Sequence, residues 1–149
     1  MKKLILLLLI PILTYSQTYN ELMTIDSLDD FKRVMIENKY ELDKIDDDGG
    51  LIYILLSING DQSIREGRYW KDGSWQLQFG RKGSLLLLSQ IMDYEDTVEG
   101  IRDNCSYVNI ENIKEIDYVS YQCEYSDFDG KIGFMIREGV GFIRYFPNK

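Results

Sequence analysis

The chain has 149 residues, with 17 lysines and arginines against 25 aspartates and glutamates, and it contains no histidine. The net charge of −8 argues against a nucleic-acid partner, whose phosphates need a basic surface, and against binding to an anionic membrane. The lack of histidine removes Ser-His-Asp and Cys-His catalysis and histidine-liganded zinc.

The N-terminus has the three-part layout of a secretory signal peptide over residues 1–16. Two lysines precede the apolar run 4–13, and the small residues Thr14 and Ser16 follow it. A helix over this run spans roughly 15 Å, about half of a bilayer core. We therefore predict cleavage after Ser16 and an exported protein, periplasmic or secreted, with no membrane span left after cleavage. The alternative is a retained N-terminal anchor.

Residues 17–149 have the length of one domain, and their first element is a predicted helix over 27–38. Phe31 and Met35 lie on one helical face within it. Ser27 and Asp30 have the S-x-x-D spacing of a capping box, which marks a helix start.

Strand-like segments separated by turn residues follow this helix. The clearest lies at the end of the series, where Trp75, Leu77 and Phe79 alternate with polar residues, as in a strand with one buried face. Residues 40–45 alternate weakly, and strands are predicted at 51–58, 64–70 and 74–80.

The second half of the chain shows a similar plan. Tyr94, Val98 and Ile101 form a helical stripe behind a possible cap at Asp93. The segment 84–92 fits either a strand or the start of a longer second helix. Three further strands are predicted at 116–126, 131–137 and 140–146.

An offset of 67 residues aligns the two halves as a weak repeat, with units of about 26–83 and 93–149. Without a gap, Ile52 falls on Val119. The predicted fold class is therefore α+β, with two tandem helix-plus-antiparallel-sheet units packed as one domain.

Cys105 and Cys123 are the two cysteines of the chain. An even number of cysteines in an exported protein indicates one disulfide, here between the end of the second helix and a strand. Two buried free thiols are the alternative. Two cysteines also cannot supply an all-thiolate zinc site, and no glycine-rich phosphate-binding motif is present, so we expect no cofactor.

Asp127 and Asp129 raise the question of calcium, since they stand before Gly130 as in an EF-hand loop. Tyr125 and Ile136 then occupy the first and last loop positions, where oxygen ligands are required. A tight turn is the favoured interpretation and we assign no metal ligand, although weak binding of calcium by these aspartates stays open.

Tyr69, Trp70 and Tyr118 are the candidate partner-binding residues. Neighbouring residues of a strand point to opposite faces, so Tyr69 and Trp70 cannot both lie in the core. Tyrosine and tryptophan are enriched in protein interfaces. The alternative is that these rings pack harmlessly against nearby loops.

The sequence favours an exported, non-enzymatic binding protein, such as an inhibitor, an immunity-like factor or an envelope accessory protein. Its expected partner is another exported or envelope protein. No catalytic residue is assigned. A carboxylate-dependent hydrolase of the cell envelope or of polysaccharides is the alternative, because many acids are present, but their spacing singles out no pair.

Overall fold

A computed structural model describes residues 19–56, 60, 63–81, 87–124 and 129–148. The signal peptide predicted at 1–16 lies outside the described residues, as does most of the hairpin turn expected at 59–61.

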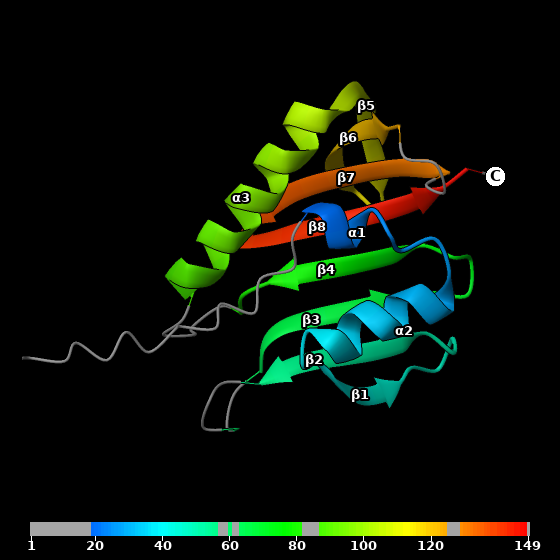
Figure 1. Cartoon of the computed structure of the whole chain (residues 1–149), viewed down its shortest axis with the longest axis vertical. Coiled ribbons are helices and arrows are strands. Elements are labelled where there is room, and N and C mark those ends of the chain that lie inside the picture. Colours follow the sequence, from blue (N-terminus) through cyan, green and yellow to red (C-terminus); the bar gives the residue numbers. More distant parts are fainter. Residues whose placement is uncertain (1–18, 57–59, 61–62, 82–86, 125–128, 149) are drawn as a thin grey trace, which may run out of the picture.

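The described residues form one antiparallel sheet of eight strands with three helices, which confirms the α+β class (Figure 1). The order of strands across the sheet is β1-β2-β3-β4-β8-β7-β6-β5. The helices are α1 (Tyr19–Leu22), α2 (Leu28–Glu37) and α3 (Leu87–Asn104). The strands are β1 (Glu41–Ile45), β2 (Leu51–Leu56), β3 (Ser63–Tyr69), β4 (Trp75–Phe79), β5 (Cys105–Ile113), β6 (Ile116–Cys123), β7 (Gly130–Arg137) and β8 (Val140–Pro147).

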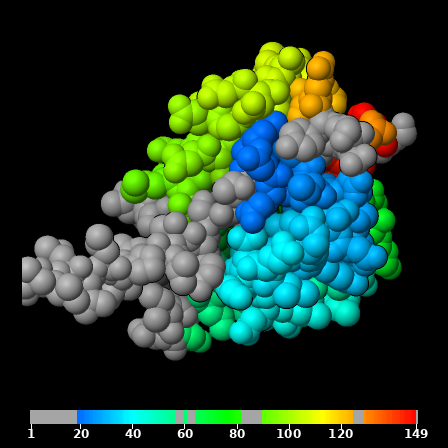
Figure 2. Space-filling view, in the orientation of Figure 1, coloured from blue at the N-terminus to red at the C-terminus, as the bar shows by residue number. Residues whose placement is uncertain are grey.

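All three helices lie on the same face of the sheet, where they form one layer (Figures 1 and 2). The Phe31 ring on α2 lies 5.4 Å from the ring of Tyr69 on β3. The Tyr94 ring on α3 lies 5.8 Å from that of Phe79 on β4. We call this side the helix-covered face. No described helix lies on the other side.

The core lies between the helices and the sheet and contains the residues that the sequence pattern assigned to it. Trp75, Leu77 and Phe79 are 0% exposed. The stripe on α3 is buried as well, with Ile101 also at 0%. Full burial of a large apolar side chain contributes about 1.5–3 kcal/mol to the folded state.

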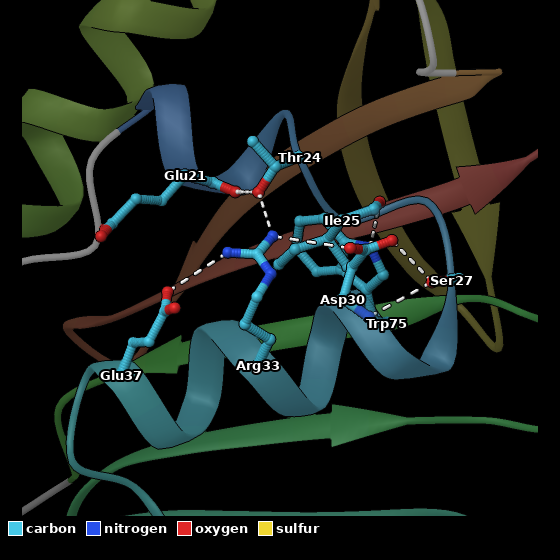
Figure 3. Close-up of polar contacts among 8 residues, drawn as sticks. All are labelled: Glu21, Thr24, Ile25, Ser27, Asp30, Arg33, Glu37 and Trp75. Atoms are coloured by element: carbon cyan, nitrogen blue, oxygen red, sulfur yellow. Dashed lines mark hydrogen bonds and ion pairs between the residues drawn. The ribbon is translucent and has the colours of Figure 1, made fainter.

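The capping box at the start of α2 is confirmed (Figure 3). Ser27 is the N-cap, and its Oγ accepts a hydrogen bond from the backbone N–H of Asp30 at 3.2 Å. The same hydroxyl donates to the Asp30 carboxylate at 2.6 Å. Nearby, the Trp75 indole N–H donates to the carbonyl of Ile25 at 3.4 Å, which ties the segment between α1 and α2 to the core.

The predicted disulfide between Cys105 and Cys123 is confirmed. The two residues stand directly opposite each other in β5 and β6, with Cα atoms 4.4 Å apart, a spacing typical of a non-hydrogen-bonded antiparallel pair. The prediction that the bond joins the end of the second helix to a strand is wrong. Because α3 ends at Asn104 and β5 begins at Cys105, the bond joins two neighbouring strands.

The region around α3 differs from the sequence prediction in two ways. Helix α3 begins at Leu87, so the described part of 84–92 is helical, and Asp93 lies inside the helix rather than at its cap. Strand β5, which starts directly after the helix, was not predicted. All but three of its residues are exposed, so buried and exposed residues do not alternate along the strand as they do in a strand with one buried face.

The gap-free repeat does not hold in β2 and β6. Ile52 pairs with Arg68, on the face opposite the helices, since its neighbour Tyr53 packs on Phe31 of α2. Val119 pairs instead with Phe134, which lies under Arg102 of α3. A slip of one residue exchanges the faces of a strand, so an offset of 67 aligns residues that point in opposite directions here.

Candidate binding surface

The second face of the sheet is built by one row of paired residues and their neighbours two positions away. Strand pairing runs from Arg68 through Gln76, Arg144 and Gly133 to Ser120. Because side chains alternate along a strand, positions two residues from this row share its side. We call this side the uncovered face, defined by Arg68, Trp70, Gln76, Gln78, Tyr118, Ser120, Gly133, Met135, Phe142, Arg144 and Phe146.

The centre of this face is a stack of arginine on aromatic rings. The guanidinium carbon of Arg144 lies 4.3 Å from the centroid of the Trp70 ring and 5.7 Å from that of Phe146. Arg68 approaches Trp70 as well, at 5.8 Å. Each such contact contributes about 0.5–1 kcal/mol at an exposed site, and more where it is desolvated.

Arg144 is positioned by these rings and not by hydrogen bonds. Its Nε is buried and has no hydrogen-bond partner among the described residues. Leaving a buried donor unpaired costs about 1–3 kcal/mol, so such a group calls for an explanation. Arg68, in contrast, forms an ion pair with Glu66 at 3.3 Å, with both side chains about one-third exposed.

Tyr118 extends the stack toward β6. Its ring lies edge-on to Phe146, with centroids 5.7 Å apart, and its hydroxyl donates to the side-chain oxygen of Gln76 at 3.0 Å. Tyr118 is only 2% exposed, so it packs against Phe146 and offers little surface to a partner.

A cavity of about 340 Å³ opens over the stack. It takes residues from both halves of the sheet and mixes apolar with charged side chains. Four of the lining side chains are cationic and two are carboxylates, in a chain whose net charge is −8. The lining comprises Asp46, Asp48, Arg68, Trp70, Gln76, Ile113, Lys114, Ile116, Tyr118, Met135, Arg137, Phe142 and Arg144.

The β5–β6 turn at the rim of this cavity has an unusual backbone. Lys114 and Glu115 have φ of +50° and +66°. A two-residue hairpin turn with both φ values positive is normally filled by Asn-Gly. The β7–β8 turn, by comparison, has glycine at its second position, Gly139, with φ of +79°. Strain in the β5–β6 turn therefore accompanies the placement of Lys114 at the cavity.

Asp72 lies in the turn after Trp70, and the positive charge of Arg144 lowers its pKa. Burial raises its pKa, but hydrogen bonds from the Ser74 hydroxyl and N–H, at 2.6 Å and 2.9 Å, together with Arg144, bring the pKa below its usual value. Asp72 is therefore ionised at neutral pH and is an acidic neighbour of Arg144.

The structure brings together two of the three predicted partner-binding residues. Trp70 and Tyr118 line the same cavity. Tyr69 lies on the other side, packed against Phe31 at 5.4 Å, as expected from the alternation of neighbouring strand residues.

The sequence prediction did not include Arg68 or Arg144. A signal was available within each strand, since Arg68 stands two residues before Trp70 and Arg144 two before Phe146, and such spacing puts side chains on one face. The pairing of β4 with β8, which unites these strands, has no signature in the sequence.

A second arginine is buried on the helix-covered face. Arg65 is 2% exposed, forms an ion pair with Asp93 and donates to the side chain of Gln90, both on α3. Burial raises the pKa of Asp93 even though Arg65 opposes the shift. Burial also raises the pKa of Tyr40 to about 12, again opposed by Arg65. These groups interact with one another inside the protein rather than with a ligand site.

Acidic residues form no comparable centre. Glu95 and Glu99 line a cavity of about 460 Å³ beside α3, together with Arg102. Among the described residues, no group of three or more cysteine or acidic side chains could hold a metal ion. Asp127 lies outside the described residues, and the Asp129 carboxylate accepts a hydrogen bond from the Asn148 side chain at 2.7 Å.

Comparisons with protein-family models, with curated proteins and with solved structures give no match to this chain. None of the described helices has the length and apolar character needed to cross a membrane.

Proposed function

We propose that this chain is an exported, non-enzymatic binding protein whose partner is another exported or envelope protein, and that it binds through the uncovered face. The stack of Arg144 on Trp70 carries the proposal. Arginine and tryptophan are among the residues most enriched at the energetic centres of protein interfaces. Here they meet in a cavity, and the guanidinium keeps donors that no described residue uses.

Export is supported by the signal-like residues 1–16 and by the disulfide. Disulfides persist in oxidising compartments and are rare where thiols are kept reduced. The bond between Cys105 and Cys123 joins β5, at the edge of the sheet, to its neighbour β6, which suits a protein that works outside the cytoplasm.

We also propose that the two halves are tandem units that share one sheet. Each half is a helix followed by a four-strand meander, α2 with β1–β4 and α3 with β5–β8. The halves join where β4 pairs with β8. Trp70 comes from the first unit and Arg144 from the second, so the binding cavity exists only because the units are fused.

Crosslinking in the native host tests the proposed function. The wild-type protein and a Trp70→Ala variant, each with a C-terminal tag, are crosslinked mildly, and the captured proteins are identified by mass spectrometry. The proposal expects one dominant exported or envelope protein that is lost with Trp70→Ala. The control is Arg33→Gln, since Arg33 lies on α2 and is 45% exposed. A partner retained by Trp70→Ala, or no partner of the wild-type protein, contradicts the proposal.

A further inference from the structure

We infer that the cavity on the uncovered face selects an acidic segment of a partner protein, one in which a carboxylate side chain stands next to an apolar one. The inference rests on the proposed function and names the chemistry that this function requires.

The charge of the cavity is opposite to that of the protein. Arg68, Lys114, Arg137 and Arg144 line it, against Asp46 and Asp48. The remainder of the chain is strongly acidic. A cationic hollow in an acidic surface attracts a single anionic group locally, while the protein as a whole repels an extended polyanion. This balance favours one or two carboxylates over a nucleic acid or an anionic membrane.

Arg144 has the geometry to bind a carboxylate. Its guanidinium carbon lies 4.3 Å from the centroid of the Trp70 ring, and it makes no hydrogen bond or ion pair with any described residue. A guanidinium presents two parallel N–H groups to a carboxylate, and such charge-assisted pairs are about twice as strong as neutral ones. The aromatic rings fix its orientation in advance, which lowers the entropy lost on binding.

The guanidinium carbon of Arg68 lies 5.8 Å from the centroid of the same Trp70 ring, and Arg68 already pairs with Glu66. An incoming carboxylate can share or replace this exposed pair at little cost, because exposed ion pairs contribute about 0–1 kcal/mol. Two arginines thus lie close to one ring.

The apolar part of the lining sets the second requirement. Ile113, Ile116, Met135 and Phe142 lie beside the cations. Binding sites combine apolar walls with a few polar groups that fix orientation, and methionine adapts to the shape of its partner. An acidic side chain flanked by an apolar one satisfies both parts of the cavity.

Peptide binding tests the inference on the full protein purified from its host. Three capped eight-residue peptides share two apolar residues between Gly-Ser ends and differ at two intervening positions, which carry glutamate, glutamine or lysine. Binding is followed by tryptophan fluorescence and by calorimetry. The chain has two tryptophans, and Trp75 is 0% exposed, so the fluorescence change reports on Trp70.

We expect the glutamate peptide to bind at least about tenfold tighter than the glutamine peptide, a difference of about 1.4 kcal/mol, and the lysine peptide to bind weakest. Affinity should fall as salt rises. Arg144→Gln and Arg68→Gln should each weaken the glutamate peptide by about tenfold, and Arg33→Gln should change nothing. Two arginine variants are used so that a folding defect in one does not decide the result.

Three outcomes would overturn the inference. Equal affinity for the three peptides contradicts selection of acidic side chains. If the fluorescence of Trp70 changes with all three, the uncovered face still binds peptides, and the proposed function is not contradicted. Tighter binding to phosphatidylglycerol vesicles than to the glutamate peptide assigns the cavity to lipid. Absence of binding at millimolar peptide contradicts the inference but not the proposed function, because the crosslinking experiment tests that function independently.

Discussion

Arg65 and Arg144 lie on opposite faces of the same sheet, and both stack on an aromatic ring. Arg65 lies 5.0 Å from the ring centroid of Phe79, and Arg144 lies 4.3 Å from that of Trp70. They differ in their polar partners. Helix α3 supplies Asp93 and Gln90 to Arg65, whereas no described helix lies above Arg144. A guanidinium that the fold itself neutralises is structural, and one that the fold leaves open is available to a ligand.

The largest expected effect is on the helix-covered face. Asp93→Ala leaves the Arg65 side chain, which is 1% exposed, without its carboxylate. Removing one partner of a buried ion pair costs about 3–5 kcal/mol, so we expect the free energy of unfolding to fall by about 4 kcal/mol. Urea unfolding measures it. A loss below about 1 kcal/mol would mean that the ion pair with Asp93 does not make Arg65 a structural residue.

The next effect is a loss of stability at alkaline pH from the same face. The pKa of Tyr40 is raised to about 12, and burial also raises that of Tyr94. In the unfolded chain tyrosine ionises near pH 10. The folded state therefore holds these protons longer, and the stabilisation, complete below about pH 10, is lost as pH rises toward 12.

Unfolding free energies from pH 8 to 12 test this linkage. Tyr40→Phe should flatten the decline, and Tyr107→Phe, at a position 58% exposed, should leave it unchanged. An identical decline in the Tyr40 variant would show that burial of Tyr40 does not drive the effect.

A smaller effect, of opposite sign, is expected at the cavity rim. Glu115 has φ of +66°, and a residue other than glycine pays about 1 kcal/mol there. Glu115→Gly should therefore stabilise the protein by about 1 kcal/mol, measured by thermal unfolding. Because Lys114 is kept, binding of the glutamate peptide should persist. Destabilisation by this variant would contradict the claim that the turn is strained.

The smallest expected effect on stability is at Arg144 itself. Arg144→Gln removes stacking contacts worth about 0.5–1 kcal/mol each, but breaks no hydrogen bond or ion pair with a described residue. Because the variant also removes the buried Nε that has no hydrogen-bond partner among the described residues, which costs about 1–3 kcal/mol, the two effects oppose each other. We expect the free energy of unfolding to change by less than about 1 kcal/mol while affinity for the glutamate peptide falls. A loss as large as that of Asp93→Ala would make Arg144 a structural residue.

Local patterns in the sequence predicted much of the fold. The alternation of Trp75, Leu77 and Phe79 identified β4 and its buried face, and the spacing of Ser27 and Asp30 identified the start of α2. Both signals depend only on neighbouring residues. Strand β5 was not predicted because an edge strand with most of its residues exposed need not alternate apolar with polar residues.

The binding surface was less accessible to prediction because it depends on distant residues. Trp70 and Arg144 meet only through the register of β3, β4 and β8. The sequence singled out Trp70 and Tyr118 by residue type, but it could not show that Tyr118 is covered or that Arg144 lies on Trp70. The gap-free repeat likewise failed where a slip of one residue exchanged the two faces.

Photo-crosslinking from each face in the native host would show which face of the sheet the partner contacts. A photoreactive phenylalanine analogue replaces Phe142 in the cavity of the uncovered face, or Ile36 on α2, which is 62% exposed. We expect a specific protein adduct from position 142 and none from position 36. Adducts from position 36 alone would place the partner on the helices and contradict binding through the uncovered face.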